Sequence, residues 1–170
     1  MRSRSPWAVV LIDTAVWAGW STAVGYAARQ LPSGALARDA GVTRIRQWEH
    51  DGRTWEAVGI RRWKDRLPDF GPVLGSSSKR HLPGWGVDGL ERFAVETRRA
   101  ELVHWAIPAA LPLFALWNPP ALFSAMALYA VAANVPCLLV QRYNRARIEQ
   151  LLTRRRERAR RQGSAGARQG

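Results

Sequence analysis

Three apolar segments divide the chain. The first runs from Trp7 to Ala28, and its 22 residues contain a single charge, Asp13. A helix of that length spans a bilayer at about 1.5 Å per residue. The other two segments, residues 102–117 and 121–140, are separated only by Asn118-Pro119-Pro120. Because this connection is short and proline ends helices, the two segments are expected to form a helical hairpin.

A secretory signal peptide is the alternative for the first segment, which follows Arg2 and Arg4 and ends in small residues. Its apolar part is long for a signal peptide, and it contains four aromatic residues typical of membrane interfaces, namely Trp7, Trp17, Trp20 and Tyr26. We therefore expect a retained membrane helix over 7–28. Asp13 should either lie away from the centre of the helix or face protein, because a charge at the centre of a membrane helix costs about 2.5 to 3.5 kcal/mol.

Residues 29–87 are polar and basic, and glycine and proline interrupt them. We expect a loop here, with one short interfacial helix where Trp55, Gly59 and Trp63 recur at helical spacing. Residues 71–86 have the composition of a linker.

A helix is predicted to begin at Asp88, with Asp88 as N-cap and Glu91 as its capping partner. It should continue to Trp117 with kinks at Pro108 and Pro112. One face of this helix changes from apolar to polar along the chain, and it contains Leu90, Phe93, Ala94, Thr97, Glu101 and His104.

Counting outward from Pro119 on two antiparallel helices predicts the register of the hairpin to within about one turn, because of the prolines in the first arm. The expected opposing pairs are His104 with Asn134, Thr97 with Gln141, and Glu96 with Arg142. The second helix, over residues 121–161, should continue beyond its apolar part as a basic extension. Residues 162–170 are expected to form a disordered tail.

The net charge of +13 and the pI near 11.5 raise nucleic-acid binding as an alternative. The arginines flank apolar segments, however, as they do in the cytoplasmic loops of membrane proteins. Residues 29–101 and 141–170 hold nearly all of the basic side chains, so three spans with the N-terminus outside would place both segments in the cytoplasm. The run from Arg154 to Arg161 is expected to hold anionic lipid headgroups. The single Cys137 excludes an intrachain disulfide.

The pattern therefore predicts an all-α integral membrane protein of the cell membrane. Its parts would be an N-terminal membrane helix, a C-terminal transmembrane helical hairpin, a basic cytoplasmic loop and an Arg-rich helical tail.

Two strings of residues carry a resemblance to a known family. They are Glu96-Thr97-Arg98-Arg99-Ala100-Glu101-Leu102-Val103-His104-Trp105, and Ala133-Asn134-Val135-Pro136 followed by Val140-Gln141-Arg142-Tyr143-Asn144-Arg145-Ala146-Arg147, with Arg62-Trp63-Lys64 as a shorter match. With these residues the chain resembles the bacterial glycosyl-4,4'-diaponeurosporenoate acyltransferase family. The segment from Asp69 to Pro83 departs most from the family's pattern.

The resemblance implies a membrane acyltransferase that esterifies a sugar hydroxyl of a glycosylated carotenoid acid with a fatty acyl group. That reaction is the last step of a staphyloxanthin-like pigment pathway. The acyl donor would be acyl-CoA or acyl carrier protein, and no other cofactor is expected. The alternative is a non-catalytic membrane scaffold or lipid-binding protein that organises pigment or lipid enzymes.

Acyl transfer to a sugar needs a base, because a hydroxyl is a poor nucleophile at neutral pH. Two of the three histidines, His50 and His81, lie in the polar segment, and only His104 lies on a helix at the expected membrane edge. A histidine suits this task because its charge changes near neutral pH. Either Glu101, one turn earlier, or Asn134, across the hairpin, would hold its ring in the useful tautomer.

The other candidates surround this histidine in the matched strings. Glu96 is either a catalytic carboxylate or the partner of Arg92 and Arg99 in a structural ion pair. Arg99, Arg142 and Asn144 are donors suited to a developing oxyanion or to the diphosphate of coenzyme A. The remaining candidate substrate-binding residues are Arg145, Trp63 and Lys64.

Other chemistries have weaker support. Glu101 and His104 have metal-ligand spacing on a helix, but a di-iron bundle needs a second such pair and further carboxylates, so no metal is expected. No serine lies in a nucleophile elbow. Membrane lipids and a glycosylated carotenoid or related glycolipid acceptor are the expected partners, other pigment-pathway enzymes are candidate partners, and nucleic acid is not expected.

Overall fold

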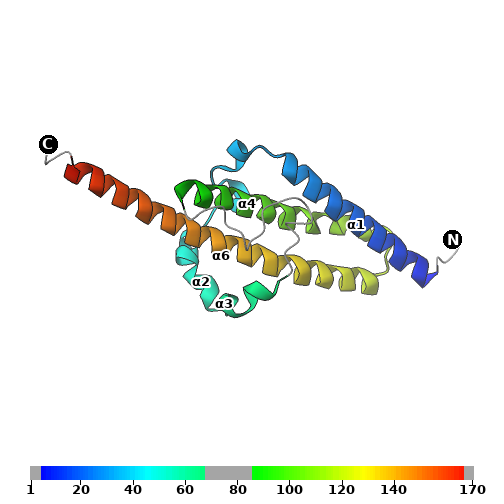
Figure 1. Cartoon of the computed structure of the whole chain (residues 1–170). Helices are drawn as coiled ribbons and strands as arrows, with labels where there is room; N and C mark the ends of the chain where they lie inside the picture. Colours follow the sequence, from blue (N-terminus) through cyan, green and yellow to red (C-terminus); the bar gives the residue numbers. More distant parts are fainter. Residues whose placement is uncertain (1–4, 68–85, 167–170) are drawn as a thin grey trace.

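The computed structural model describes residues 5–67 and 86–166, and every regular element within these ranges is helical. Three helices dominate: α1 (Pro6–Gln30), α4 (Val87–Ala106) and α6 (Pro120–Gly166). The shorter elements are η1 (Ser33–Leu36), η2 (Gly41–Thr43), η3 (Gln47–Gly52), α2 (Arg53–Glu56), α3 (Ile60–Trp63), η4 (Lys64–Arg66), η5 (Pro108–Ala110) and α5 (Leu111–Phe114). In Figure 1, α4 runs antiparallel to α1 and α6, so the start of α1 lies at the same end as the start of α6.

Two of these helices, α1 and α6, are long and apolar enough to cross a membrane. Only 11% and 22% of their most apolar stretches are buried, whereas the core helix of a soluble protein is mostly buried. Large apolar side chains on these helices are exposed, such as Leu11 (69%) and Leu128 (71%). An apolar outer surface of this kind is what contact with lipid requires, so the two helices indicate a membrane protein.

The first arm of the hairpin is broken rather than merely kinked. Helix α4 ends at Ala106, and the chain continues through η5 and α5 because Pro108 and Pro112 lack the N–H groups that a continuous helix needs. The amide of Ala110 therefore donates to the carbonyl of Ile107 at 3.3 Å and leaves the Ala106 carbonyl without its helical donor. The indole N–H of Trp20 in α1 donates to that carbonyl at 3.1 Å.

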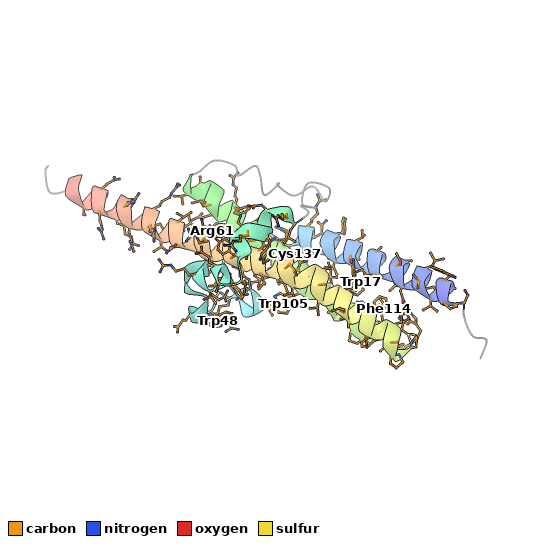
Figure 2. The ribbon with its side chains drawn as sticks, turned by 90° about the horizontal axis from the view of Figure 1, so that it is seen from below. Trp17, Trp48, Arg61, Trp105, Phe114 and Cys137 are labelled. Carbon is orange, nitrogen blue, oxygen red and sulfur yellow. The ribbon has the colours of Figure 1, made fainter. Side chains whose placement is uncertain are left out.

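Asp13 faces protein, which is one of the two placements that its position in an apolar helix predicted. Its side chain is 5% exposed and accepts hydrogen bonds from Trp117 Nε1 at 2.7 Å and Asn118 Nδ2 at 3.1 Å. One turn further along α1, Trp17 contacts Phe114 with the ring centroids 5.5 Å apart, and Figure 2 shows the two side chains between the helices. Trp17 therefore packs against the hairpin, a contact that its expected role as an interfacial anchor did not include.

Helices α4 and α6 pack through an apolar cluster of Leu90, Ala94, Ile148 and Leu152. The predicted N-cap of α4 was wrong by two residues. The helix begins at Val87 with Gly86 as N-cap and has no side-chain cap, so Asp88 lies inside the first turn. There its negative charge still interacts favourably with the helix dipole, while the expected capping partner, Glu91, pairs with Arg156 of α6.

The elements between α1 and α4 cover one side of α6 where its apolar part ends. Ile60, Val140 and Tyr143 form the buried centre of this contact. The single interfacial helix predicted around Trp55 and Trp63 was wrong: α2 and α3 are separate, because Gly59 adopts a left-handed conformation (φ 68°) between them. Most of the linker predicted over 71–86 lies outside the described residues.

Helix α6 is longer than predicted, since it continues to Gly166 instead of ending near Arg161. The expected disorder over 162–166 was therefore wrong, and residues 167–170 lie outside the described ranges. Arginine and alanine, which dominate this end of the helix, are strong helix formers, and no proline follows Pro136 to end it.

We expect Gly52→Ala to destabilise the protein by about 1 to 3 kcal/mol, because it places a side chain at φ +89°. The added Cβ would also lie 3.2 Å from Cδ2 of Tyr143 on α6. Thermal unfolding of the detergent-solubilised protein, followed by tryptophan fluorescence, measures the loss. Gly34→Ala is the control, since Gly34 has open space around it and no positive φ; equal melting temperatures for the two variants would contradict this account.

Candidate active site

His104 and Asn134 meet across the hairpin, as the register predicted. Nδ1 of His104 lies 3.0 Å from Oδ1 of Asn134. The histidine is half-buried near the end of α4, and the asparagine is 4% exposed within the apolar part of α6. A polar pair at this depth is uncommon in a membrane helix and usually has a function.

The hydrogen bonds of Asn134 determine the tautomer of His104. The amide nitrogen of Asn134 donates to the carbonyl of Ala130 at 2.9 Å, so its oxygen is the atom that faces the histidine. An amide oxygen only accepts, and Nδ1 of His104 must therefore carry the proton. In the neutral ring, this leaves the basic lone pair on Nε2.

A second group of polar side chains lies at the polar end of the hairpin. Glu101 is fully buried, and its carboxylate lies 2.5 Å from Arg142 Nη1 and 2.5 Å from Arg145 Nη1. The contact with Arg145 is a charge contact whose angles fall outside hydrogen-bond geometry. Glu101 therefore binds the arginines of α6, and Asn134 is the residue that orients His104.

Carboxylates from the loop and from both helices complete this group. Asp39 contacts Arg98 at 2.5 Å and Arg145 at 3.2 Å. We call the whole group the ion network; it contains three arginines, Arg98, Arg142 and Arg145, and four carboxylates, Asp39, Glu49, Glu101 and Glu149.

The arginines of the ion network also bind the loop backbone. Arg98 donates to the carbonyl of Leu36 at 3.1 Å, and Arg145 donates to that of Thr43. Arg142 donates to Val42 at 3.0 Å and to Arg44 at 2.9 Å. Short 3-10 helices leave many carbonyls without backbone partners, and buried carbonyls need donors. The arginines supply these donors and hold residues 36–44 against the hairpin.

All five N–H donors of Arg142 have partners inside the protein. Two go to loop carbonyls, one goes to Glu101, and the other two go to Glu49, from Nε at 3.1 Å and from Nη2. Burial alone lowers the pKa of Arg142, but the hydrogen bonds and charges of Glu49 and Glu101 outweigh burial and raise it. The guanidinium is thus permanently charged and structurally occupied in this conformation, and substrate binding by Arg142 stays a prediction.

The register prediction fails for Glu96 and Arg142, because Arg142 pairs with Glu101. Side chains on a helix point toward its N-terminus, so in an antiparallel pair the long side chains of α6 reach toward later residues of α4. Glu96 instead accepts from Arg99 Nε at 3.3 Å. Arg99 also donates to the carbonyls of Ala28 and Leu31, the latter at 2.9 Å, and ties α4 to the end of α1.

The other predicted residues lie apart from His104. Trp63 packs against the Ile60 cluster and donates to the carbonyl of Val58 at 3.1 Å. Lys64 pairs with its neighbour Asp65. Asn144 is half-buried, with no side-chain hydrogen bond to any described residue. His81 and the side chain of His50 lie outside the described parts, and within those parts no three acidic, histidine or cysteine residues gather as metal ligands.

Sequence reasoning missed four members of the ion network as site residues: Asp39, Glu49, Arg98 and Glu149. Arg98 stands inside the first matched string, but nothing local separates it from Arg99. A charge count at the polar end of the hairpin was the available signal. Several arginines there face few carboxylates on the helices, so acidic residues from the loop are needed to balance them.

We expect Glu149→Gln to raise the melting temperature at neutral pH. Burial first, and then the charge of Asp39, raise the pKa of Glu149 above its ordinary value of 4.5. A raised folded-state pKa means that folding favours the protonated acid, so this stabilising contribution is lost as pH rises through the folded-state value.

The gain from glutamine should therefore shrink as pH falls toward the ordinary value of 4.5 and below it, where the acid becomes protonated in both states. Melting curves from pH 4 to 7.5 would measure this difference in melting temperature. Glu157→Gln is the control, because Glu157 is exposed and lies outside the ion network. A lower melting temperature for Glu149→Gln at neutral pH would contradict the assignment.

Comparison with known proteins places this arrangement in a family. A profile of the glycosyl-4,4'-diaponeurosporenoate acyltransferase family matches residues 39–154. Proteins with that name from Staphylococcus aureus strains USA300 and NCTC 8325 / PS 47 are each 38% identical to this chain over 109 residues. The aligned region covers 62% of this chain and 64% of each relative. No solved structure matches the chain.

The profile covers more than half of the chain and includes the His104–Asn134 pair and every member of the ion network. This protein therefore belongs to the glycosyl-4,4'-diaponeurosporenoate acyltransferase family.

Proposed function

We propose that this protein is a membrane O-acyltransferase that esterifies a sugar hydroxyl of a glycosylated carotenoid acid, as the last step of a staphyloxanthin-like pigment pathway. The observation that carries the proposal is the His104–Asn134 pair in a chain of this family. In this pair a titratable base, His104, lies against the apolar part of α6, where a lipid-soluble acceptor would present its sugar.

The reaction needs a single base, which takes a proton from the sugar hydroxyl and later gives it to the departing thiolate. Nε2 of His104 takes the proton of the sugar hydroxyl as its oxygen attacks the thioester carbonyl. The tetrahedral intermediate collapses, the carbon–sulfur bond breaks, and the imidazolium gives its proton to the departing sulfur. The products are the sugar ester and the free thiol. Asn134 is a positioning residue, since its acceptor oxygen keeps the proton on Nδ1.

The ion network supports this chemistry from a distance. Asn134 and Arg142 are eight residues apart on α6, about 12 Å along the axis. Glu101 and Arg142 would thus hold the two arms of the hairpin in the register that brings His104 to Asn134. Arg99, Asn144, Arg145, Trp63 and Lys64 remain candidate contacts for the donor or the acceptor.

In the proposed orientation the protein lies in the cell membrane, with the ion network and the end of α6 in the cytoplasm. The excess of arginine in the loop and in the end of α6 supports this orientation. The acyl donor would then be a cytosolic thioester, either acyl-CoA or acyl carrier protein, and it would approach the hairpin from its polar end.

We expect His104→Ala to lower the rate of ester formation by about 10²- to 10⁴-fold, the usual contribution of a general base. Membranes that contain equal amounts of each protein are incubated with acyl donor and glycosylated carotenoid acid, and mass spectrometry measures the added acyl group. His104→Ala with wild-type activity would reject the catalytic role. If the wild-type protein also forms no ester, the scaffold alternative replaces the enzyme.

Asn134→Leu should lose roughly 100-fold in kcat, because the ring of His104 is no longer oriented. Asn134→Asp keeps the acceptor oxygen and adds a negative charge that favours the imidazolium, so its activity should return but rise at higher pH than in the wild type. The pH–rate profiles of the three proteins provide the measurement. If Asn134 were only structural, its substitution would lower the yield of folded protein and leave the pH–rate profile of the folded fraction unchanged.

A further inference from the structure

The end of α6 extends beyond the rest of the molecule. Figure 1 shows the helix continuing past the start of α4 with no other element beside it. Arg156 pairs with Glu91 in the first turns of α4, and α6 then runs on to Gly166. Packing against α4 does not account for this part of α6, so it needs a separate explanation.

One side of this extension has a regular pattern. Positions at spacings of four, three, four and three residues lie along one face of a helix, and here all of them are exposed. A neighbouring face, about 100° round the helix, contains Ile148 and Leu152, which contact α4. We call the exposed face the basic stripe; its members are Arg147, Leu151, Arg154, Arg158 and Arg161.

The composition of the basic stripe is that of a protein-binding surface. Leu151 lies among the arginines and is 41% exposed. Arg154, Arg158 and Arg161 form no ion pair with any described residue. Arginine beside an exposed apolar side chain is a combination enriched in protein interfaces, where the apolar group is covered and the charges select the partner.

Most of the basic stripe lies too far from the membrane to hold its headgroups. The apolar part of α6 ends at Val140, so Arg154 lies about 21 Å further along the unbroken helix and Arg161 about 31 Å. The headgroup layer is only about 5 to 7 Å thick on each side, and its potential decays over about 8 Å at physiological ionic strength. A tilt of about 20° changes these heights little.

We propose that the basic stripe docks an acidic carrier protein that delivers the acyl chain as a thioester. This inference rests on the proposed function, which requires an activated acyl donor from the aqueous side. The charge of the stripe is complementary to an acidic helical protein, and its length over residues 147–161, about 21 Å, matches one helix of such a partner. Coenzyme A is a small donor that has no need of a surface this far from His104.

Binding of palmitoyl-loaded acyl carrier protein to the full chain in nanodiscs of neutral phosphatidylcholine tests the proposal. We expect Arg154→Glu/Arg158→Glu to weaken binding by about ten-fold or more. The matched control, Arg155→Glu/Arg160→Glu, makes the same change in charge away from the stripe and should bind like the wild type. Leu151→Ser should weaken binding with no change in charge.

Four results would overturn the proposal. In the first three, the wild type does not bind the carrier protein, the stripe variant binds it as tightly as the wild type, or both double variants lose equal affinity. The fourth is a wild-type protein whose stripe binds anionic vesicles or nucleic acid but not the carrier protein. Ester formation with palmitoyl-CoA keeps the proposed function separate. If the wild type forms the ester with palmitoyl-CoA but does not bind the carrier protein, docking fails and the enzyme stands. If the wild type forms no ester with either donor, the enzyme fails.

Discussion

The buried contact of Glu101 with Arg142 and Arg145 is the interaction on which the rest of the structure depends. It joins the two arms of the hairpin at the point where their apolar parts end. Charges are costly to bury unless each one is paired and hydrogen-bonded. The protein meets this requirement by bringing a loop to the arginines, so that Asp39, Glu49 and three backbone carbonyls complete their coordination.

This requirement explains how a loop with little regular structure becomes ordered. Between α1 and α4 the described chain forms only short helices, which bury few apolar side chains of their own. Donors from α4 and α6 hold its backbone, while Ile60 and the neighbouring tryptophans cover Val140 and Tyr143. The ion pairs thus fix the position of the loop on the hairpin, and the apolar cluster around Ile60 excludes water from one side of the ion network.

The proline break in the first arm has a related consequence. A continuous helix from Val87 to Trp117 would need no partner for the carbonyl of Ala106, whereas the broken arm needs the indole of Trp20. Together with Arg99 and Asp13, this contact attaches α1 to the hairpin at three levels. In a membrane, where the hydrophobic effect does not drive helices together, such polar contacts hold the bundle.

The sequence by itself determined the helical class, two of the three apolar segments as long helices, the hairpin and the pairing of His104 with Asn134. These follow from local rules, namely hydrophobic length, proline position and a count of residues from a short turn. Even there, the end of α6 and the start of α4 were misplaced, since arginine and alanine propagate a helix further than their charge suggests and a cap depends on geometry.

Only the tertiary structure decided which charges meet. Glu96 and Glu101, or Arg98 and Arg99, are equivalent by spacing, yet Glu101 and Arg98 enter the ion network, while Glu96 pairs with Arg99, which binds the end of α1. The tilt of side chains toward each helix N-terminus shifts the long arginines by more than one turn. Their carboxylate partners Asp39 and Glu49 lie about 50 to 100 residues away in the chain, so no local pattern could reveal them.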